Sequence, residues 1–262
     1  MMIRLVTFDA LHTLVTPRLP IYIQYSQTFA PFIGDLDPNS IKQSFKVALK
    51  QVQQEMPVYK SDNGAQGWWA EVIKRTAIGA GADRTAVESS LPEMVPKLLH
   101  RFSSKEGYKL FDESIFVLRE LHRMKIRTAL ISNTDARMRL ALDDLDVSKY
   151  FNPMLLSEEV GIEKPDVEIF QRACQKTTYL DGNVADTVSP QEVVHVGDEL
   201  VCDYNGAQSA GMEALLIRRP GPEGESERRE DGENIQGLSV VNDLWGVVEW
   251  VKAHNSNASH GS

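Results

Sequence analysis

Five short apolar segments occur along the chain, and each has the pattern of a buried β-strand. They are four to six residues long, rich in valine, leucine and isoleucine, and separated by more polar stretches. Near-continuous apolar runs of this length are typical of strands covered on both faces, as in a parallel sheet. The predicted strands are Ile3–Phe8, Arg127–Ile131, Pro153–Leu156, Gln191–Val196 and Glu213–Ile217.

Segments with apolar residues at three- and four-residue steps follow these strands and predict helices. In Asp112–Met124, for example, Ile115, Leu118 and Leu121 share one helical face. Strands that alternate with helices predict an α/β fold, with a Rossmann-like parallel sheet covered by helices on both faces. We expect a loop over Leu180–Pro190. The other predicted helices are Ala136–Leu145, Asp166–Lys176, Tyr204–Ala210 and Val241–Val251.

The region between the first two strands has only helical periodicity. Ile41, Phe45 and Ala48, for example, are separated by three or four residues. We therefore expect an inserted domain of about four helices over residues 16–109.

The domain organisation follows from this insert and from the polar end of the chain. The α/β core is predicted to be discontinuous, formed by residues 1–15 and 110–253. Residues 254–262 (HNSNASHGS) are small and polar, and we expect them to be disordered.

Composition narrows the possible partners. The 262 residues carry a net charge of −9, which argues against a nucleic-acid binder, because such a protein needs a basic face. A small phosphorylated molecule is still compatible with this charge, because a metal ion and a few donors can hold one phosphate. No apolar run approaches the length of a membrane span, and the N-terminus has no targeting pattern. We expect a cytoplasmic protein, with the nucleus left open, that is a monomer or a simple homodimer.

Compact polar groups follow four of the predicted strands. They are Asp9, the pair Ser132-Asn133, the pair Lys164-Pro165, and Gly197-Asp198 with Asp203. Sites in open parallel sheets form at the carboxyl ends of the strands, so these groups are expected to converge. Each group alone is more typical of a turn or a helix cap, but their combination on successive strand ends predicts a functional site.

The residue types suggest a division of roles at this site. Asp9 is the candidate nucleophile, and Asp198 and Asp203 can hold Mg²⁺ together with it. Ser132 and Asn133 stand at the start of a helix, where they can bind a phosphate. Lys164 adds a positive charge that offsets the acids and an anionic substrate, which makes it a candidate for catalysis and for phosphate binding.

These four groups resemble the four motifs of the haloacid dehalogenase superfamily. The resemblance implies that Asp9 forms an aspartyl-phosphate, that Ser132 and Lys164 hold the phosphate, and that Asp198 and Asp203 organise Mg²⁺. It also implies that the helical insert is the cap of that family, which closes over the active site. The Trp68-Trp69 pair and the run from Val196 to Tyr204 are similar to the eukaryotic haloacid dehalogenase-like hydrolase domain-containing 3 proteins, although packing in the cap is the preferred role of the tryptophans.

One position departs from the pattern of the family phosphatases. They usually carry a second Asp two residues after the nucleophile, which protonates the leaving group and later activates water. Here that residue is Leu11, which can do neither. The next position, usually Gly, is His12, a possible substitute acid or base because of its pKa range.

Three classes of function are compatible with this departure. The preferred one is a Mg²⁺-dependent phosphatase of low or narrow activity. The second is a dehalogenase or a phosphonatase-type hydrolase, since family members with these activities also lack the second Asp. The presence of the metal-binding pattern at Asp198 and Asp203 argues against a dehalogenase, which is metal-independent. A phosphonatase needs a lysine from the cap. The third is a non-catalytic protein that binds a phosphorylated ligand or a partner protein. The candidate cap lysines are Lys42, Lys46, Lys50 and Lys60.

Overall fold

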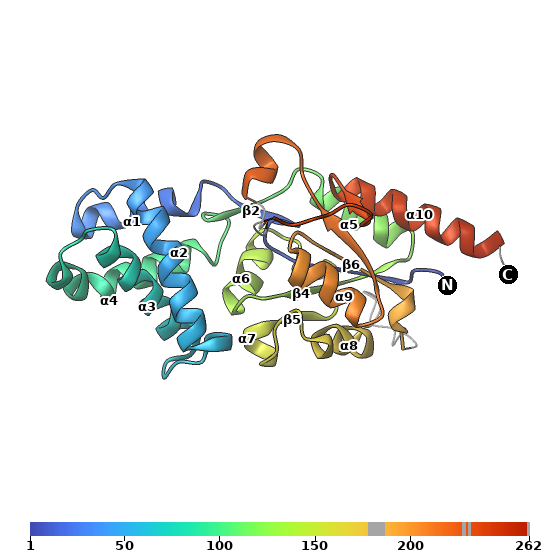
Figure 1. Cartoon of the computed structure of the whole chain (residues 1–262), viewed down its shortest axis with the longest axis horizontal. Coiled ribbons are helices and arrows are strands. Elements are labelled where there is room, and N and C mark those ends of the chain that lie inside the picture. The colour runs from blue at the N-terminus through green and yellow to red at the C-terminus, as the bar shows by residue number, and fades with distance from the viewer. Residues whose placement is uncertain (178–186, 227–228, 230–231, 261–262) are drawn as a thin grey trace. The chain divides into compact units, whose positions relative to one another are not determined.

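The computed structural model describes residues 1–177, 187–226, 229 and 232–260. Residues 180–186 of the predicted Leu180–Pro190 loop lie outside this part. The chain divides into two compact units, drawn in Figure 1. The core unit contains Met1–Thr16, Leu110–Thr134 and Leu145–Ser262, and the helical unit contains Pro17–Lys109 and Asp135–Asp144.

The core unit is built on a six-stranded parallel sheet with the order β5-β4-β1-β6-β7-β8. This confirms the predicted α/β fold. All five predicted strands are present, and the sixth, β8, has only two residues, too few to give a periodic pattern. The strands are β1 (Leu5–Phe8), β4 (Arg127–Ser132), β5 (Met154–Leu156), β6 (Val193–Gly197), β7 (Glu213–Ile217) and β8 (Val240–Val241). A separate two-stranded sheet pairs β2 (Val15–Pro17) with β3 (Tyr108–Leu110).

Helices cover both faces of the six-stranded sheet. Helix α5 (Ser114–Arg123) packs against α10 (Leu244–His260), whereas α8 (Val167–Lys176) and α9 (Gly206–Ser209) pack against the opposite face. The predicted helix Tyr204–Ala210 is a π-helix over Leu200–Asn205 followed by α9. The shorter elements are α7 (Ser157–Val160) and 3-10 turns at Ser148–Tyr150, Pro190–Glu192 and Gly221–Ser226.

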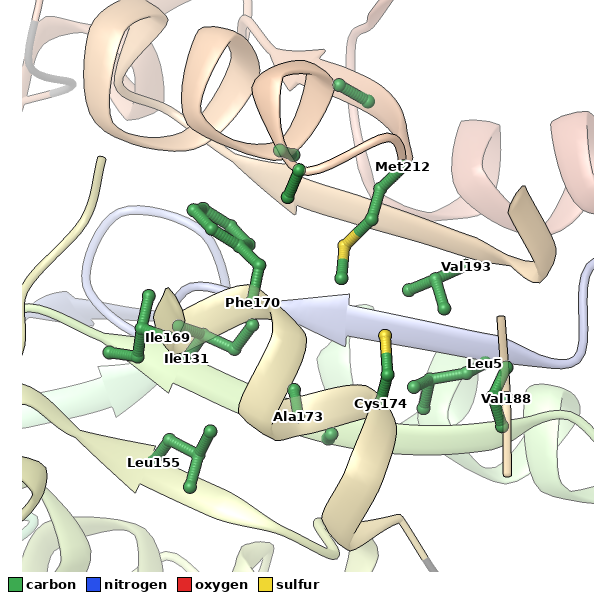
Figure 2. Close-up of a cluster of buried hydrophobic side chains, with 14 of the residues drawn as sticks. Leu5, Ile131, Leu155, Ile169, Phe170, Ala173, Cys174, Val188, Val193 and Met212 are labelled. Atoms are coloured by element: carbon green, nitrogen blue, oxygen red, sulfur yellow. The ribbon is translucent and has the colours of Figure 1, made fainter. Parts of the chain in front are cut away.

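The face under α8 holds a hydrophobic cluster of the core unit. Figure 2 shows Cys174 of α8 beside Leu5 and Val193, and Ile169 of the same helix lies near Ile131 in the same cluster. Side chains alternate between the two faces of a strand, so the residues two positions further along β1 and β6 point to the same face. These residues are the polar Thr7 and His195, and both are buried.

The end of the chain differs from the expectation of disorder. Helix α10 continues to His260, so residues 254–260 are helical; residues 261–262 lie outside the described part. The physical reason is a tertiary contact: the Asn255 side chain accepts from Ile3 N–H at 2.6 Å and donates to Ile3 C=O at 3.0 Å. The His254 ring also stacks on Trp250. These contacts can order a polar segment whose composition alone predicts a flexible tail.

The inserted region folds into the four helices that its periodicity predicts. They are α1 (Ile21–Ile33), α2 (Pro38–Glu55), α3 (Gly64–Gly79) and α4 (Arg84–Arg101), with a 3-10 turn at Pro57–Tyr59. Helix α6 (Ala136–Asp144), which follows the Ser132-Asn133 pair in sequence, belongs to the helical unit. Among the described residues, no helix is both long enough and apolar enough to cross a membrane.

The two adjacent tryptophans of the helical unit have different environments. Trp68 is buried, donates its indole N–H to Met56 C=O at 2.8 Å and packs in the cluster of α2 and α3. Trp69 donates to the Asp135 carboxylate at 2.6 Å, and the Arg137 guanidinium lies 4.2 Å from the centre of its ring. Packing within the helical unit, the preferred prediction, therefore accounts for Trp68, whereas Trp69 anchors a polar cluster.

Candidate active site at the carboxyl ends of the strands

The candidate nucleophile lies immediately after the central strand β1. The Asp9 N–H donates to Val196 C=O at 2.9 Å, which continues the pairing of β1 with β6 by one residue. Strand β4, on the other side of β1, ends at Ser132, whose hydroxyl donates to Asp9 Oδ1 at 3.0 Å. The parallel register thus brings together residues that are far apart in the sequence.

The Lys164 ammonium group lies at the centre of this site. Its Nζ is 2.7 Å from Asp9 Oδ1 and 2.5 Å from Asp203 Oδ1, and the lysine is 3% exposed. Two carboxylates and one ammonium group therefore form buried ion pairs. Such an arrangement is stable only when each charge keeps its partners, because desolvating an isolated charge is costly.

Burial and the central lysine shift the pKa values of the two acids in opposite directions. Burial raises the pKa of Asp9 to about 6, although the nearby Lys164 charge lowers it. Burial also raises the pKa of Asp203. The Lys164 charge and the hydrogen bond from His195 outweigh this effect and hold the pKa of that carboxyl well below its usual range. The two acids in turn keep the pKa of Lys164 above its usual value despite its burial.

Three buried carboxylates lie close enough together to share a cation. Asp9, Asp198 and Asp203 each offer an oxygen, and these oxygens lie within 4.8 Å of one another. Hard oxygen donors that leave room for water and substrate are what Mg²⁺ prefers. The donor set therefore fits this ion.

A glycine allows Asp203 to approach β6 closely. A Cβ atom built on Gly197 would lie 2.1 Å from Asp203 Cγ, a distance that real atoms do not reach. We expect Gly197→Ala to displace the Asp203 carboxylate, lower stability by about 1–3 kcal/mol and weaken Mg²⁺ binding by about tenfold or more. Urea denaturation and titration calorimetry measure the two effects. Ala207→Gly, a change in α9, serves as the control for Mg²⁺ affinity. If Gly197→Ala binds Mg²⁺ as tightly as the unaltered chain does, the prediction is contradicted.

The Asn133 side chain contacts the lysine loop. Its amide nitrogen donates to Lys164 C=O at 2.8 Å, and its carbonyl oxygen accepts from Lys164 N–H at 2.7 Å. Both polar ends of the Asn133 side chain are thus engaged by one backbone position. The Asn133 side chain therefore holds the Lys164 backbone, and the contact of Asn133 with phosphate stays a prediction.

Sequence reasoning missed the two arginines that follow β7. The Arg218 guanidinium donates to Asp198 C=O at 2.5 Å and pairs with the Glu233 carboxylate. The Arg219 guanidinium donates to Thr13 C=O at 3.1 Å and pairs with Glu113 at 2.5 Å. Each arginine therefore holds a loop that follows a strand and carries one of the clustered acids, Asp198 or Asp9. Two adjacent arginines directly after an apolar strand were the signal available in the sequence.

The turn after Asp9 keeps an unusual backbone at His12. This residue has a φ of 63° and donates its N–H to Val15 C=O at 2.7 Å. Left-handed backbone costs a residue with a Cβ roughly 1–2 kcal/mol, which explains why glycine suits this position. Leu11, beside it, is half-buried and has an apolar side chain. The role of His12 as a substitute acid or base stays a prediction.

Comparisons with known proteins agree with this geometry. The family model for haloacid dehalogenase-like hydrolases matches residues 3–211. The human haloacid dehalogenase-like hydrolase domain-containing protein 3 is 30% identical over 220 residues, which cover 83% of each chain, so the predicted similarity to that group is confirmed.

Solved structures share the fold at lower identity. A 2-haloacid dehalogenase from Pseudomonas syringae pv. Tomato DC3000 is 23% identical with a TM-score of 0.60, and the match covers 96% of this chain and 99% of that one. A phosphatase from Thermococcus onnurineus is 19% identical with a TM-score of 0.59, covering 97% and 100%. At this identity the two structures indicate the fold and do not distinguish their activities. With the family match over most of its length and the four motif groups gathered at one sheet edge, this chain belongs to the haloacid dehalogenase-like hydrolases.

Proposed function

We propose that this hydrolase is a Mg²⁺-dependent phosphatase of low or narrow activity, with Asp9 as its nucleophile. The observation that carries the proposal is the cluster of three buried carboxylates formed by Asp9, Asp198 and Asp203. The metal-independent carbon–halogen chemistry of the family does not need three acids at this position. Phosphoryl transfer benefits from a cation that offsets the charge of the phosphate.

The reaction has two displacements at phosphorus. In the first, an Asp9 oxygen forms a bond to phosphorus while the bond to the leaving-group oxygen breaks. In the second, water attacks phosphorus, the bond to Asp9 breaks, and inorganic phosphate leaves with a proton released to solvent. Lys164 and the Ser132 hydroxyl both contact Asp9 Oδ1, which supports a role for them in holding phosphate oxygens beside it. Bound Mg²⁺ supplies the charge that brings two anions together.

The apolar residue at position 11 restricts the substrates. Without an acid there, the leaving group must depart without receiving a proton from that position. Small acyl phosphates and aryl phosphates, whose leaving groups are stable anions, fit this limit better than alkyl phosphates. We therefore propose a small phosphorylated molecule with a good leaving group as the substrate class.

A test of Asp9 measures phosphate release from acetyl phosphate and p-nitrophenyl phosphate with Mg²⁺ and with chelator. We expect Asp9→Asn to lower the rate by a factor of about 10⁴ or more, because the variant lacks the nucleophile. Asp143→Asn, at an exposed position, should keep the full rate. If the unaltered chain and Asp9→Asn release phosphate equally slowly, the phosphatase proposal fails. Halide release from a 2-haloacid without metal would favour the dehalogenase.

A second candidate function rests on Leu11 alone. A site that keeps its metal acids and phosphate donors but has no acid at this position could bind a phosphorylated ligand without turning it over. In that case, phosphate would bind in the presence of Mg²⁺, and no substrate would be hydrolysed. The phosphonatase alternative has less support, because the four candidate cap lysines are all exposed and nothing singles one of them out: Lys42, Lys46, Lys50 and Lys60.

A further inference from the structure

A buried histidine lies behind the carboxylate cluster and has no part in the proposed reaction. His195 is on β6, is 1% exposed, and pairs in register with Thr7 of β1. Both side chains point to the face of the sheet that α8 covers. The ring of Phe170 meets the imidazole at 85° with 5.1 Å between centroids, which holds the imidazole plane.

The two nitrogens of His195 have different partners. Nδ1 is 2.8 Å from the Thr7 hydroxyl oxygen, and Nε2 is 3.1 Å from Asp203 Oδ1. An ionised carboxylate can only accept, so Nε2 must carry the proton. Nδ1 of a neutral ring with its proton on Nε2 accepts, and the Thr7 hydroxyl donates to it.

The Asp203 carboxylate is held from three directions. Its Oδ1 receives hydrogen bonds from His195 and from the Lys164 ammonium group, and its Oδ2 receives one from Glu199 N–H at 2.9 Å. A carboxylate has about four lone-pair sites. Residues in the described part of the chain use three of them, and the fourth, on Oδ2, can take a further ligand.

We propose that His195 is a positioning residue for the cation site: its Nε2–H orients Asp203 toward Asp9 and Asp198, and the Thr7 hydroxyl fixes the imidazole in the required tautomer. This proposal rests on the proposed function in one respect, that the cation is Mg²⁺. It adds a buried chain of hydrogen bonds that runs from β1 through β6 to Asp203. Groups that orient metal ligands influence metal affinity without touching the ion.

Titration calorimetry of the full chain with Mg²⁺, without substrate, tests the proposal. We expect His195→Leu to weaken Mg²⁺ binding by about 10–100-fold, and His195→Gln, whose amide nitrogen can reach the Nε2 position, to restore most of the affinity. Thr7→Val should weaken binding by about 2–10-fold, the effect of one lost hydrogen bond. Thr7→Ser should bind as the unaltered chain does.

Val194→Ala is the matched control for a loss of packing. Val194 is fully buried on the same strand, but its side chain points to the other face of the sheet. It should lower thermal stability and leave Mg²⁺ affinity unchanged. If Val194→Ala weakens Mg²⁺ binding as much as His195→Leu, the positioning role is refuted.

The remaining outcomes separate this proposal from the proposed function. Unchanged affinity in both His195→Leu and Thr7→Val overturns the positioning role and leaves the phosphatase proposal intact. If His195→Leu does not fold, the Thr7→Val and Thr7→Ser pair decides. An unaltered chain that binds no Mg²⁺ at millimolar concentration overturns the positioning role and the metal dependence of the proposed function together.

Discussion

A Leu11→Asp variant is expected to hydrolyse alkyl phosphates about 10²–10⁴ times faster than the unaltered chain. The new carboxyl would supply the missing proton transfers: to the leaving oxygen in the first displacement and from water in the second. The gain should be larger for glycerol phosphate than for p-nitrophenyl phosphate, because an alkoxide leaves poorly without a proton. Steady-state phosphate release with saturating Mg²⁺ measures both.

The control for this gain is Leu11→Asn. Asparagine has nearly the same shape as aspartate and is polar, but it does not exchange protons at neutral pH. If both variants gain equally, the effect comes from polarity or hydration and not from acid–base catalysis. If neither gains, the site lacks more than an acid, and the second candidate, a binding protein, becomes the better account.

Removing the central lysine is expected to cause the largest loss of stability. Lys164→Met should lower the free energy of unfolding by about 3–5 kcal/mol at pH 8, because it leaves the Asp9 and Asp203 carboxylates buried without their shared partner. Urea denaturation in the presence of chelator measures the loss. The exposed Lys176→Met variant should change stability by less than about 0.5 kcal/mol.

The loss from Lys164→Met should shrink as the pH falls. Burial raises the pKa of Asp9 to about 6 even beside Lys164, above its usual value of 3.8. When a carboxyl has a higher pKa in the folded protein than in the unfolded chain, its charged form destabilises the fold at pH values above that pKa. As the pH falls, the folded protein takes up the proton before the unfolded chain does, and the destabilisation is relieved. Without the lysine charge this relief should be larger, so the variant should recover part of its stability between pH 8 and pH 5. An equal loss at both pH values would contradict the buried ion cluster.

Several features of the site were accessible from the sequence because they depend on local pattern. Apolar runs of four to six residues mark strands wherever they occur, and the carboxyl ends of parallel strands lie at one edge. The convergence of Asp9, Ser132 and Lys164 therefore follows from alternating elements. The departure from the family pattern at Leu11 can also be read from the sequence, because it depends only on the spacing of this residue from Asp9.

Other features depend on contacts between distant segments. Asn255 orders the C-terminal helix through Ile3, and Arg219 holds the loop of Thr13, in each case across more than 200 residues. No periodicity encodes such partners. For this reason the composition of the last residues predicts disorder, and the role of Arg219 is not predicted from the sequence.

By itself, the sequence determined the α/β class, the helical insert, the candidate nucleophile and the apolar residue two positions after it, because hydrophobic period and motif spacing are local properties. Only the tertiary structure decided that Lys164 joins two carboxylates, that the Asn133 side chain holds the Lys164 loop, and that α6 belongs to the helical unit. It also decided that His195 faces Asp203, because the register of β1 with β6 sets the side chain beside Thr7. Register and side-chain direction arise from packing between strands, which the order of residues along one strand does not specify.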